Sequence, residues 1–236
     1  MSGHSHFATI KRQKGLKDAL KSNTFGKLSK MISIAIKSGG GANPDMNFKL
    51  RVAIDKAREN NMPKDNIDRI LKNASEKMDS IEEISYEGFG PCGVGVIVET
   101  ATDNKNRTAQ EMKNLFEKGG GSLGGPNSVS YNFIDRGFLL IEKKDDVDSQ
   151  TLELIDLGVE DIEVADDGLE VFTLPDRLKE VKEKIEKAGF KILKMELTKL
   201  PKNYIEIIDE DKLNKIQNFL DSFEDHDDVQ KVYTNL

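Results

Sequence analysis

The segment Asp103–Thr108 gathers side chains that could bind an anion. Its residues are Asp103, Asn104, Lys105, Asn106, Arg107 and Thr108, and the flanking pattern places them where a strand turns into a helix. Free backbone N–H groups at a helix N-terminus attract anions, and an arginine can add a bidentate contact. The same residue types also make an ordinary helix cap with a salt bridge. Both interpretations stay open, as an anion or interdomain site or as a cap.

Metal and nucleophilic chemistry have little support in the sequence. The histidines are His4, His6 and His226, and the single cysteine, Cys92, follows Pro91 in an expected turn. Zinc sites need several converging ligands, and a cysteine nucleophile needs a nearby base. We therefore predict no metal, no cofactor and no catalytic residue, and we expect Cys92 to be a small core residue.

Two other clusters have simpler interpretations than ligand binding. The loop Gly119–Gly125 lacks the Gly-Lys-Ser/Thr ending of a phosphate-binding loop, and it follows a helix instead of a strand, so it predicts a tight turn. A second cluster, which could be mistaken for a cation site, is predicted to be a turn of solvated carboxylates. Its members are Asp221, Glu224, Asp225, Asp227 and Asp228.

Charge is divided unevenly along the chain. Residues 1–77 hold 16 Lys and Arg against 7 Asp and Glu, a net charge of +9, while residues 78–236 have a net charge of −16. Such asymmetry indicates a polyanion-binding module joined to something else. The acidic remainder argues against nucleic acid there and favours a protein partner. The candidate nucleic-acid contacts are Lys11, Arg12, Lys14, Lys17, Lys21, Lys27, Lys30, Arg51, Arg58 and Lys64.

The elements that must position these residues begin with helices. Residues 1–22 read as a basic arm, and residues 23–77 as a three-helix bundle in which apolar residues recur with a 3.6-residue period. Asn47 is a plausible N-cap for the second helix, and Pro63 can start the third. The apolar positions are Phe25, Leu28, Ile32, Ala35 and Ile36, then Leu50, Ala53, Ile54 and Ala57, then Ile67, Ile70, Leu71 and Ala74.

After residue 84 the pattern changes to alternating strands and helices. Residues 138–197 follow the βαββαβ order of the ferredoxin-like pattern, with an Asp-Gly hairpin signal at Asp167-Gly168. Strands are also expected at Val94–Val98, Ser128–Phe133 and Tyr204–Ile207, with helices over 106–118 and 210–222. The pieces 84–133 and 203–234 are each too small to cover a sheet, so we expect them to pair.

The predicted fold class is therefore α+β. An N-terminal three-helix domain is followed by two ferredoxin-like α/β domains, the third inserted in the second. The predicted boundaries are 78–134 plus 199–236 for the second domain and 135–198 for the third. No apolar run approaches the roughly 20 residues of a membrane span, and the N-terminus lacks a signal core. A cytoplasmic monomer without a membrane partner is expected.

Short blocks along the whole chain resemble the YebC/PmpR family. They are Ser2–Ser5, Ile10–Lys14, Leu50–Ala57, Asn61–Ile67, Tyr86–Pro91, Thr102–Thr108, Gly119–Gly124, Leu200–Asn203 and Glu224–Gln230. The resemblance implies three domains, the third inserted in the second. It also implies nucleic-acid binding in gene expression, because family members are described as probable DNA-binding transcriptional regulators. Mitochondrial relatives look like translational activators, and some bacterial members are linked to the ribosome.

The chain departs from the family pattern near its N-terminus. His6-Phe7 stands where Lys-Trp is usual, and Leu20–Asn23 replaces a more basic run. Met31 occupies a position that a glutamate usually holds. The arm is therefore less basic than is typical, and Phe7 would stack on a base more weakly than Trp.

Two functions follow as hypotheses. The first is a DNA-binding transcriptional regulator whose basic residues contact phosphates. The alternative is a translation factor that binds RNA on the ribosome through a flexible basic arm. An enzyme with a site around Asp103–Thr108 is disfavoured, because no catalytic motif accompanies it.

Overall fold

A computed structural model describes residues 20–73 and 81–236. Its first part is helical, with α2 (Leu20–Ser38), α3 (Phe48–Glu59) and α4 (Lys64–Lys72). All three predicted helices are confirmed. The structure differs from the predicted end of the arm at residue 22, because Leu20–Ser22 already belong to α2. Residues 1–19 lie outside the described residues.

The apolar stripes of the three helices meet in one core. Ile32, Leu50 and Ile67 are buried there, each from a different helix. Asn47 caps α3, since its side-chain oxygen accepts the Leu50 N–H at 3.0 Å. Its amide group donates to the carbonyl oxygens of Ala35 and Gly41, which fastens the end of α2 to the start of α3. The predicted cap is thus confirmed and also joins two helices.

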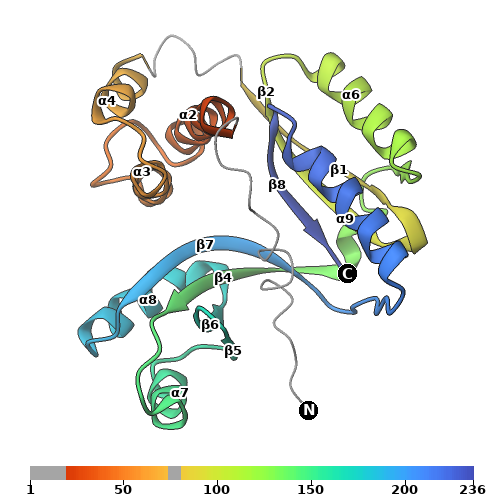
Figure 1. Ribbon diagram of the computed structural model, residues 1–236. Helices are drawn as coiled ribbons and strands as arrows, with labels where there is room; N and C mark the ends of the chain where they lie inside the picture. Colours follow the sequence, from red (N-terminus) through yellow and green to blue (C-terminus); the bar gives the residue numbers. More distant parts are fainter. Residues whose placement is uncertain (1–19, 74–80) are drawn as a thin grey trace. The chain divides into compact units, whose positions relative to one another are not determined.

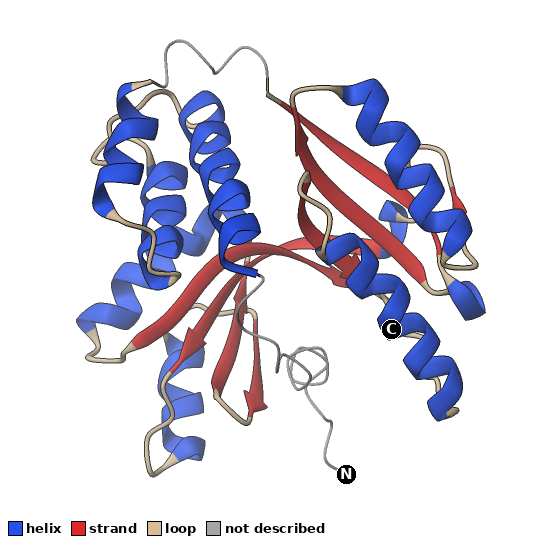
Figure 2. Ribbon diagram, turned by 45° about the horizontal axis from the view of Figure 1, so that its top comes forward, coloured by secondary structure: helices blue, strands red, loops and turns tan. Residues whose placement is uncertain are grey.

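A four-stranded antiparallel sheet follows, in the order β3-β1-β2-β8. Its strands are β1 (Glu82–Phe89), β2 (Gly95–Thr102), β3 (Ser122–Leu123) and β8 (Val229–Thr234). Helices α6 (Lys105–Lys118) and α9 (Glu210–Glu224) cover one face (Figure 2). Phe116 and Phe223, from the two helices, pack with ring centroids 4.7 Å apart.

A second four-stranded antiparallel sheet has the order β5-β6-β4-β7. Its strands are β4 (Phe133–Ile141), β5 (Asp161–Ala165), β6 (Gly168–Thr173) and β7 (Ile192–Pro201). Helices α7 (Val147–Asp156) and α8 (Leu178–Lys187) pack on it through a shared apolar core (Figure 1). The predicted βαββαβ order is confirmed, as is the hairpin, in which Ala165 pairs with Gly168.

The described residues fall into two compact units. One is 133–202, and the other combines 20–73, 81–132 and 203–236. The α+β class is confirmed, with one sheet-containing unit placed within the sequence of the other. The first sheet has two covering helices, but its chain order is ββαβαβ, so the ferredoxin-like connections occur in the second sheet alone. Within residues 20–73 and 81–236, no helix is long and apolar enough to cross a membrane.

Two predicted strands are wrong. Instead of a strand, Ser128–Asn132 contains a turn of 3₁₀ helix (η3, Ser130–Asn132), and β4 begins at Phe133. The carboxylate of Glu87 causes this, because it accepts the backbone N–H groups of Asn127, Val129 and Ser130 at 2.8 to 3.0 Å. Tyr204–Ile207 is not a strand either. There the Ile205 N–H donates to Asn235 O at 2.7 Å.

Two turns contain residues whose surroundings were predicted from the sequence, the glycine-rich loop Gly119–Gly125 and the turn that holds Cys92. In Gly119–Gly125, Gly120 has a φ of +79°, and a Cβ at Gly121 would lie 2.4 Å from the carbonyl oxygen of Phe89. This agrees with the tight turn that was predicted. Cys92 is exposed, with a φ of +61°, in the turn Pro91–Gly93 (η2), so its assignment to the core is wrong.

Candidate functional site around Asp228

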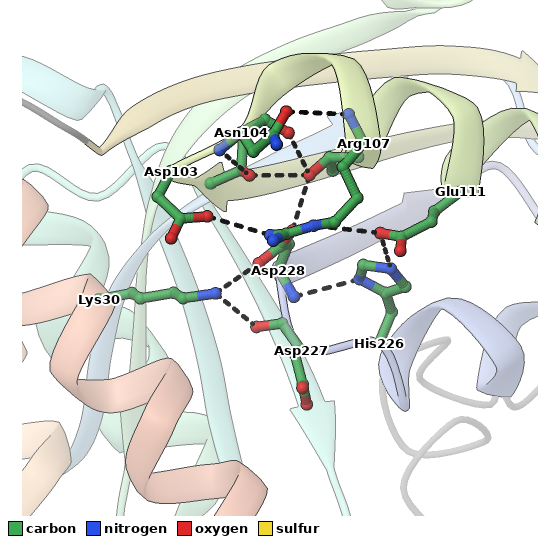
Figure 3. Close-up of polar contacts among 10 residues, drawn as sticks. Lys30, Asp103, Asn104, Arg107, Glu111, His226, Asp227 and Asp228 are labelled. Atoms are coloured by element: carbon green, nitrogen blue, oxygen red, sulfur yellow. Dashed lines mark hydrogen bonds and ion pairs between the residues drawn. The ribbon is translucent and has the colours of Figure 1, made fainter.

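The centre of the candidate site is a buried carboxylate, Asp228, in the short connection between α9 and β8. Its residue surface is 2% exposed. One carboxylate oxygen accepts from Lys30 Nζ at 2.5 Å, and the other accepts from Arg107 Nη2 at 2.9 Å and Thr108 Oγ1 at 2.7 Å (Figure 3). Three donors from α2 and α6 therefore converge on one anion.

These contacts keep Asp228 ionised. Burial alone would raise the pKa of Asp228, since a low-polarity environment disfavours the charged form. Hydrogen bonds from Lys30, Thr108 and Arg107 outweigh that effect and hold the pKa of Asp228 well below its ordinary value. The carboxylate is thus charged throughout the physiological pH range.

The start of α6 positions two of the donors. Asn104 is the N-cap, and its side-chain oxygen accepts the Arg107 N–H at 3.1 Å. Thr108 is fully buried, with its hydroxyl 2.8 Å from that of Thr102 on β2. A hydroxyl has one proton. The carboxylate of Asp228 is the charged acceptor, so Thr108 donates to it and can accept from Thr102.

An outer set of groups surrounds Arg107. Its guanidinium also contacts Asp103 at 3.1 Å and Glu111 at 3.8 Å, each four positions or fewer away along the chain. His226 Nδ1 accepts the Asp228 N–H at 3.1 Å, so its Nε2 carries the proton and donates to Glu111 at 3.0 Å. The imidazole therefore links the α9–β8 connection to α6.

The grouping of Glu111, His226 and Asp228 has the ligand types of a metal site, with ligand atoms within 4.8 Å of one another. Its electrostatics argue against that use. Lys30 and Arg107 already occupy the two oxygens of Asp228, and both are cations that a metal ion would have to displace. The arrangement suits a buried ion-pair network better than a metal centre.

The structure brings together most of the predicted anion site. Asp103, Asn104, Arg107 and Thr108 belong to the network, and the anion that Arg107 holds is the chain's own Asp228. These contacts match the alternative of a helix cap with a salt bridge. Lys105 is exposed on the first turn of α6 and takes no part.

The predicted nucleic-acid contacts lie in different settings. Lys11, Arg12, Lys14 and Lys17 are outside the described residues, and Lys21 is in α2 with its side chain undescribed. Lys27 donates to the backbone oxygen of Glu224, and Lys30 to Asp228. Both ammonium groups therefore bind the α9–β8 connection.

The remaining three cations face outward. Arg51 and Arg58 are on the exposed side of α3, and Lys64 is exposed at the start of α4. Arg58 has an exposed ion pair with Asp55 at 3.3 Å, which contributes little to stability.

Sequence reasoning missed the central residue. Asp228 was grouped with the solvated carboxylates, and that interpretation is wrong because Asp228 is buried and paired with cations. His226 and Glu111 were also missed as members of one network. A usable signal was present, since Asp228 directly precedes the apolar residue Val229, which is buried at the start of β8, and a charged side chain beside a buried position needs a partner.

Family models match nearly the whole chain. The TACO1/YebC protein N-terminal domain matches residues 5–77, and the TACO1/YebC second and third domain matches residues 81–236. The chain belongs to the TACO1/YebC family. The Asp228 network lies within the segment matched by the second model, apart from Lys30, which lies within the first.

Curated relatives and a solved structure agree with this family. A probable transcriptional regulatory protein of Thermoanaerobacter pseudethanolicus is 46% identical over 240 residues, covering 100% of this chain and 97% of the relative. Another from Bacillus licheniformis is 46% identical over 241 residues, covering 100% of both. A conserved hypothetical protein from Aquifex aeolicus has a similar crystal structure, with a TM-score of 0.87 and 39% identity over 98% of this chain and 96% of that one.

Proposed function

We propose that this chain is a non-enzymatic regulator of gene expression that binds duplex DNA through its helical part and acts in the cytoplasm. Relatives with 44% to 46% identity carry the name probable transcriptional regulatory protein. The observation that carries the proposal is the division of charge. Residues 1–77 have a net charge of +9, and the remainder of the chain is strongly acidic.

The helical part presents cations on the side that its core does not use. In α3, Leu50, Ala53, Ile54 and Ala57 face the core. Arg51 and Arg58 are two turns apart on one exposed face, because seven residues span about two helical turns. Two guanidinium groups spaced along one face of a helix can contact successive phosphates of a duplex, which supplies affinity and register without reading bases.

Salt dependence of binding tests the proposal. We would measure the binding of the full chain to a random-sequence 20-base-pair duplex by fluorescence anisotropy, from low to moderate salt. Each phosphate contact contributes about 0.9 to the slope of log K against log salt. Replacement of Arg51 and Arg58 by Gln should therefore weaken binding and reduce the slope by roughly 1.8 if both contact phosphates.

A matched control separates this surface from general charge. Lys179 and Lys187 are exposed on α8, and changing both to Gln removes the same charge from the acidic part of the chain. The control should leave affinity and slope unchanged. Equal weakening by both pairs, or salt-independent DNA binding, would contradict the proposal. Binding to ribosomes that duplex DNA cannot compete away would instead identify a translation factor that binds ribosomal RNA.

A further inference from the structure

One stretch of the 133–202 unit carries negative charge that the chain does not neutralise. Residues 145–165 contain eight Asp and Glu and no Lys or Arg. They form α7, strand β5 and the connections next to them. Among the described residues of this unit, the ion pairs all lie outside 145–165. Solvent and external cations are left to balance this charge.

Helix α8, on the same sheet, is different. Lys184 pairs with Glu180 at 2.6 Å, and Lys182 pairs with Glu186 at 3.4 Å. Its charges are therefore balanced within the helix. The contrast within one unit shows that the acidity of 145–165 is a local property of the α7 and β5 side, and that a general excess of acid does not account for it.

Exposed apolar side chains occur in the same two elements. Leu152 and Ile155 on α7 are 66% and 52% exposed, and Val164 on β5 is 57% exposed. The first two are three residues apart, so they lie on one side of the helix. The core under α7 uses Leu154 instead. Because the three exposed side chains add nothing to this core, a contact with another molecule is the natural use for them.

The position of β5 keeps this side of the sheet open. It is the outermost strand and pairs with β6 alone. A terminal strand with apolar and charged side chains can accept an extended peptide beside it. The N–H of Ile162 is already bonded to the Asp161 carboxylate at 2.9 Å, so affinity has to come mainly from side chains.

We propose that α7 and β5 form a docking surface for a lysine- and arginine-rich protein segment that also carries apolar side chains. The cations would pair with the unneutralised carboxylates, and the apolar side chains would cover Leu152, Ile155 and Val164. Nucleic acids and anionic lipids are repelled by this surface. Segments rich in Lys and Arg are typical of proteins that bind nucleic acids, and a partner of that kind is compatible with the proposed function.

A single metal ion suits the surface poorly. Metal ligands have to converge, and in the described residues the grouping that does so is Glu111, His226 and Asp228, in the other unit. The carboxylates of 145–165 are instead spread along a helix and a strand. Distributed charge favours a ligand with several cations in a row over one ion.

The test uses two dye-labelled seven-residue peptides with the full chain. One peptide alternates lysine and leucine, and the other alternates lysine and serine. Anisotropy at about 50 mM salt, where the screening length is roughly 14 Å, preserves the charge attraction. We expect the leucine peptide to bind at least fivefold more tightly than the serine peptide. Equal affinities would overturn the proposal, because the exposed apolar side chains would then contribute nothing.

Charge-reversed variants locate the site. Glu153→Lys with Asp156→Lys on α7 should weaken the leucine peptide at least tenfold. The control is Asp176→Lys with Glu183→Lys, which makes the same change in net charge. Asp176 is exposed in the turn before α8, and Glu183 is exposed on α8. This control should alter the affinity for the leucine peptide less than twofold. Similar losses from both pairs would mean nonspecific attraction and overturn the proposal.

A further pair tests the apolar contribution and the identity of the occupant. Leu152→Ser with Ile155→Ser should reduce the affinity of the leucine peptide to that of the serine peptide, with unchanged salt dependence. Sedimentation velocity of the chain alone should show the same species for wild type and for Glu153→Lys with Asp156→Lys. A dimer that this variant dissociates would make a second copy the occupant and overturn the proposal.

Discussion

Replacing Asp228 by Asn tests whether the network stabilises the unit that contains it. The substitution keeps the size and two hydrogen-bonding groups of the side chain but removes the charge that faces Lys30 and Arg107. Removing one partner of a fully buried ion pair costs about 3–5 kcal/mol. The Lys30 and Arg107 side chains are 26% and 46% exposed, so both cations can regain water. We therefore expect a loss of about 2–3 kcal/mol.

The pH dependence provides an independent check of the cause. Because the folded pKa of Asp228 lies below its ordinary value of 3.8, the unfolded chain binds this proton first as the pH falls. The stabilisation is therefore complete well above pH 3.8 and is lost as the pH falls from there towards the folded pKa. The difference between wild type and Asp228→Asn should be constant between about pH 6 and 8 and should shrink below about pH 4.

The assay is urea unfolding at pH 7, combined with hydrogen exchange to locate the effect. A chain with two compact units need not unfold in one step, so protection of amides in α6 and β8 should be followed separately from β4 and β6. Asp227→Asn is the matched control, since Asp227 is exposed beside Asp228. It should cost less than about 0.5 kcal/mol. If Asp228→Asn costs no more than the control, the network does not stabilise the fold.

Three further substitutions test the structure elsewhere. Glu87→Gln should cost about 1–2 kcal/mol at pH 7 and increase exchange at Val129 and Ser130. Backbone hydrogen bonds hold the pKa of Glu87 below 4.5 despite its burial, so this loss should shrink as the pH falls through that range. Phe223→Ala should cost about 3–5 kcal/mol in urea melts, because its fully buried ring packs on Phe116. Gly121→Ala should lower the melting temperature by several degrees, because a Cβ at Gly121 would lie 2.4 Å from the Phe89 carbonyl oxygen. Gly125→Ala is the control and should leave the melting temperature unchanged, since a Cβ there has no atom within 4 Å.

Much of the fold follows from local patterns. The apolar spacing of Leu50, Ala53, Ile54 and Ala57 marks the buried face of α3, and Asn47 marks its start. The turn at Asp167-Gly168 places the β5–β6 hairpin, and the βαββαβ order follows from alternating periodicities. Such features depend on residues within about one helical turn or one strand of each other, so the sequence shows them directly.

Strand predictions failed where a distant group decided the backbone. Ser128–Phe133 alternates like a strand, yet the carboxylate of Glu87, some 40 positions earlier, accepts two of its N–H groups and that of Asn127 just before it, which holds the start of the segment in a turn. Cys92 has a residue type that is usually buried, but its turn holds it at the surface. In the first case a contact from a distant carboxylate decided the backbone conformation, and in the second the geometry of the turn decided the exposure of the side chain.

By itself, the sequence determined the α+β class, the three N-terminal helices, the division of charge and the resemblance to a family. Tertiary structure alone decided the role of Asp228. That carboxylate meets Lys30 and Arg107, which are 198 and 121 positions away in the chain. The pKa and burial of a side chain depend on which groups surround it in space, and sequence spacing carries no such information when the partners come from two helices that are distant in the chain. The acidic stretch 145–165 shows the same limit, because its charges were visible in the sequence while the lack of ion pairs and the exposed Leu152, Ile155 and Val164 became visible only in the fold.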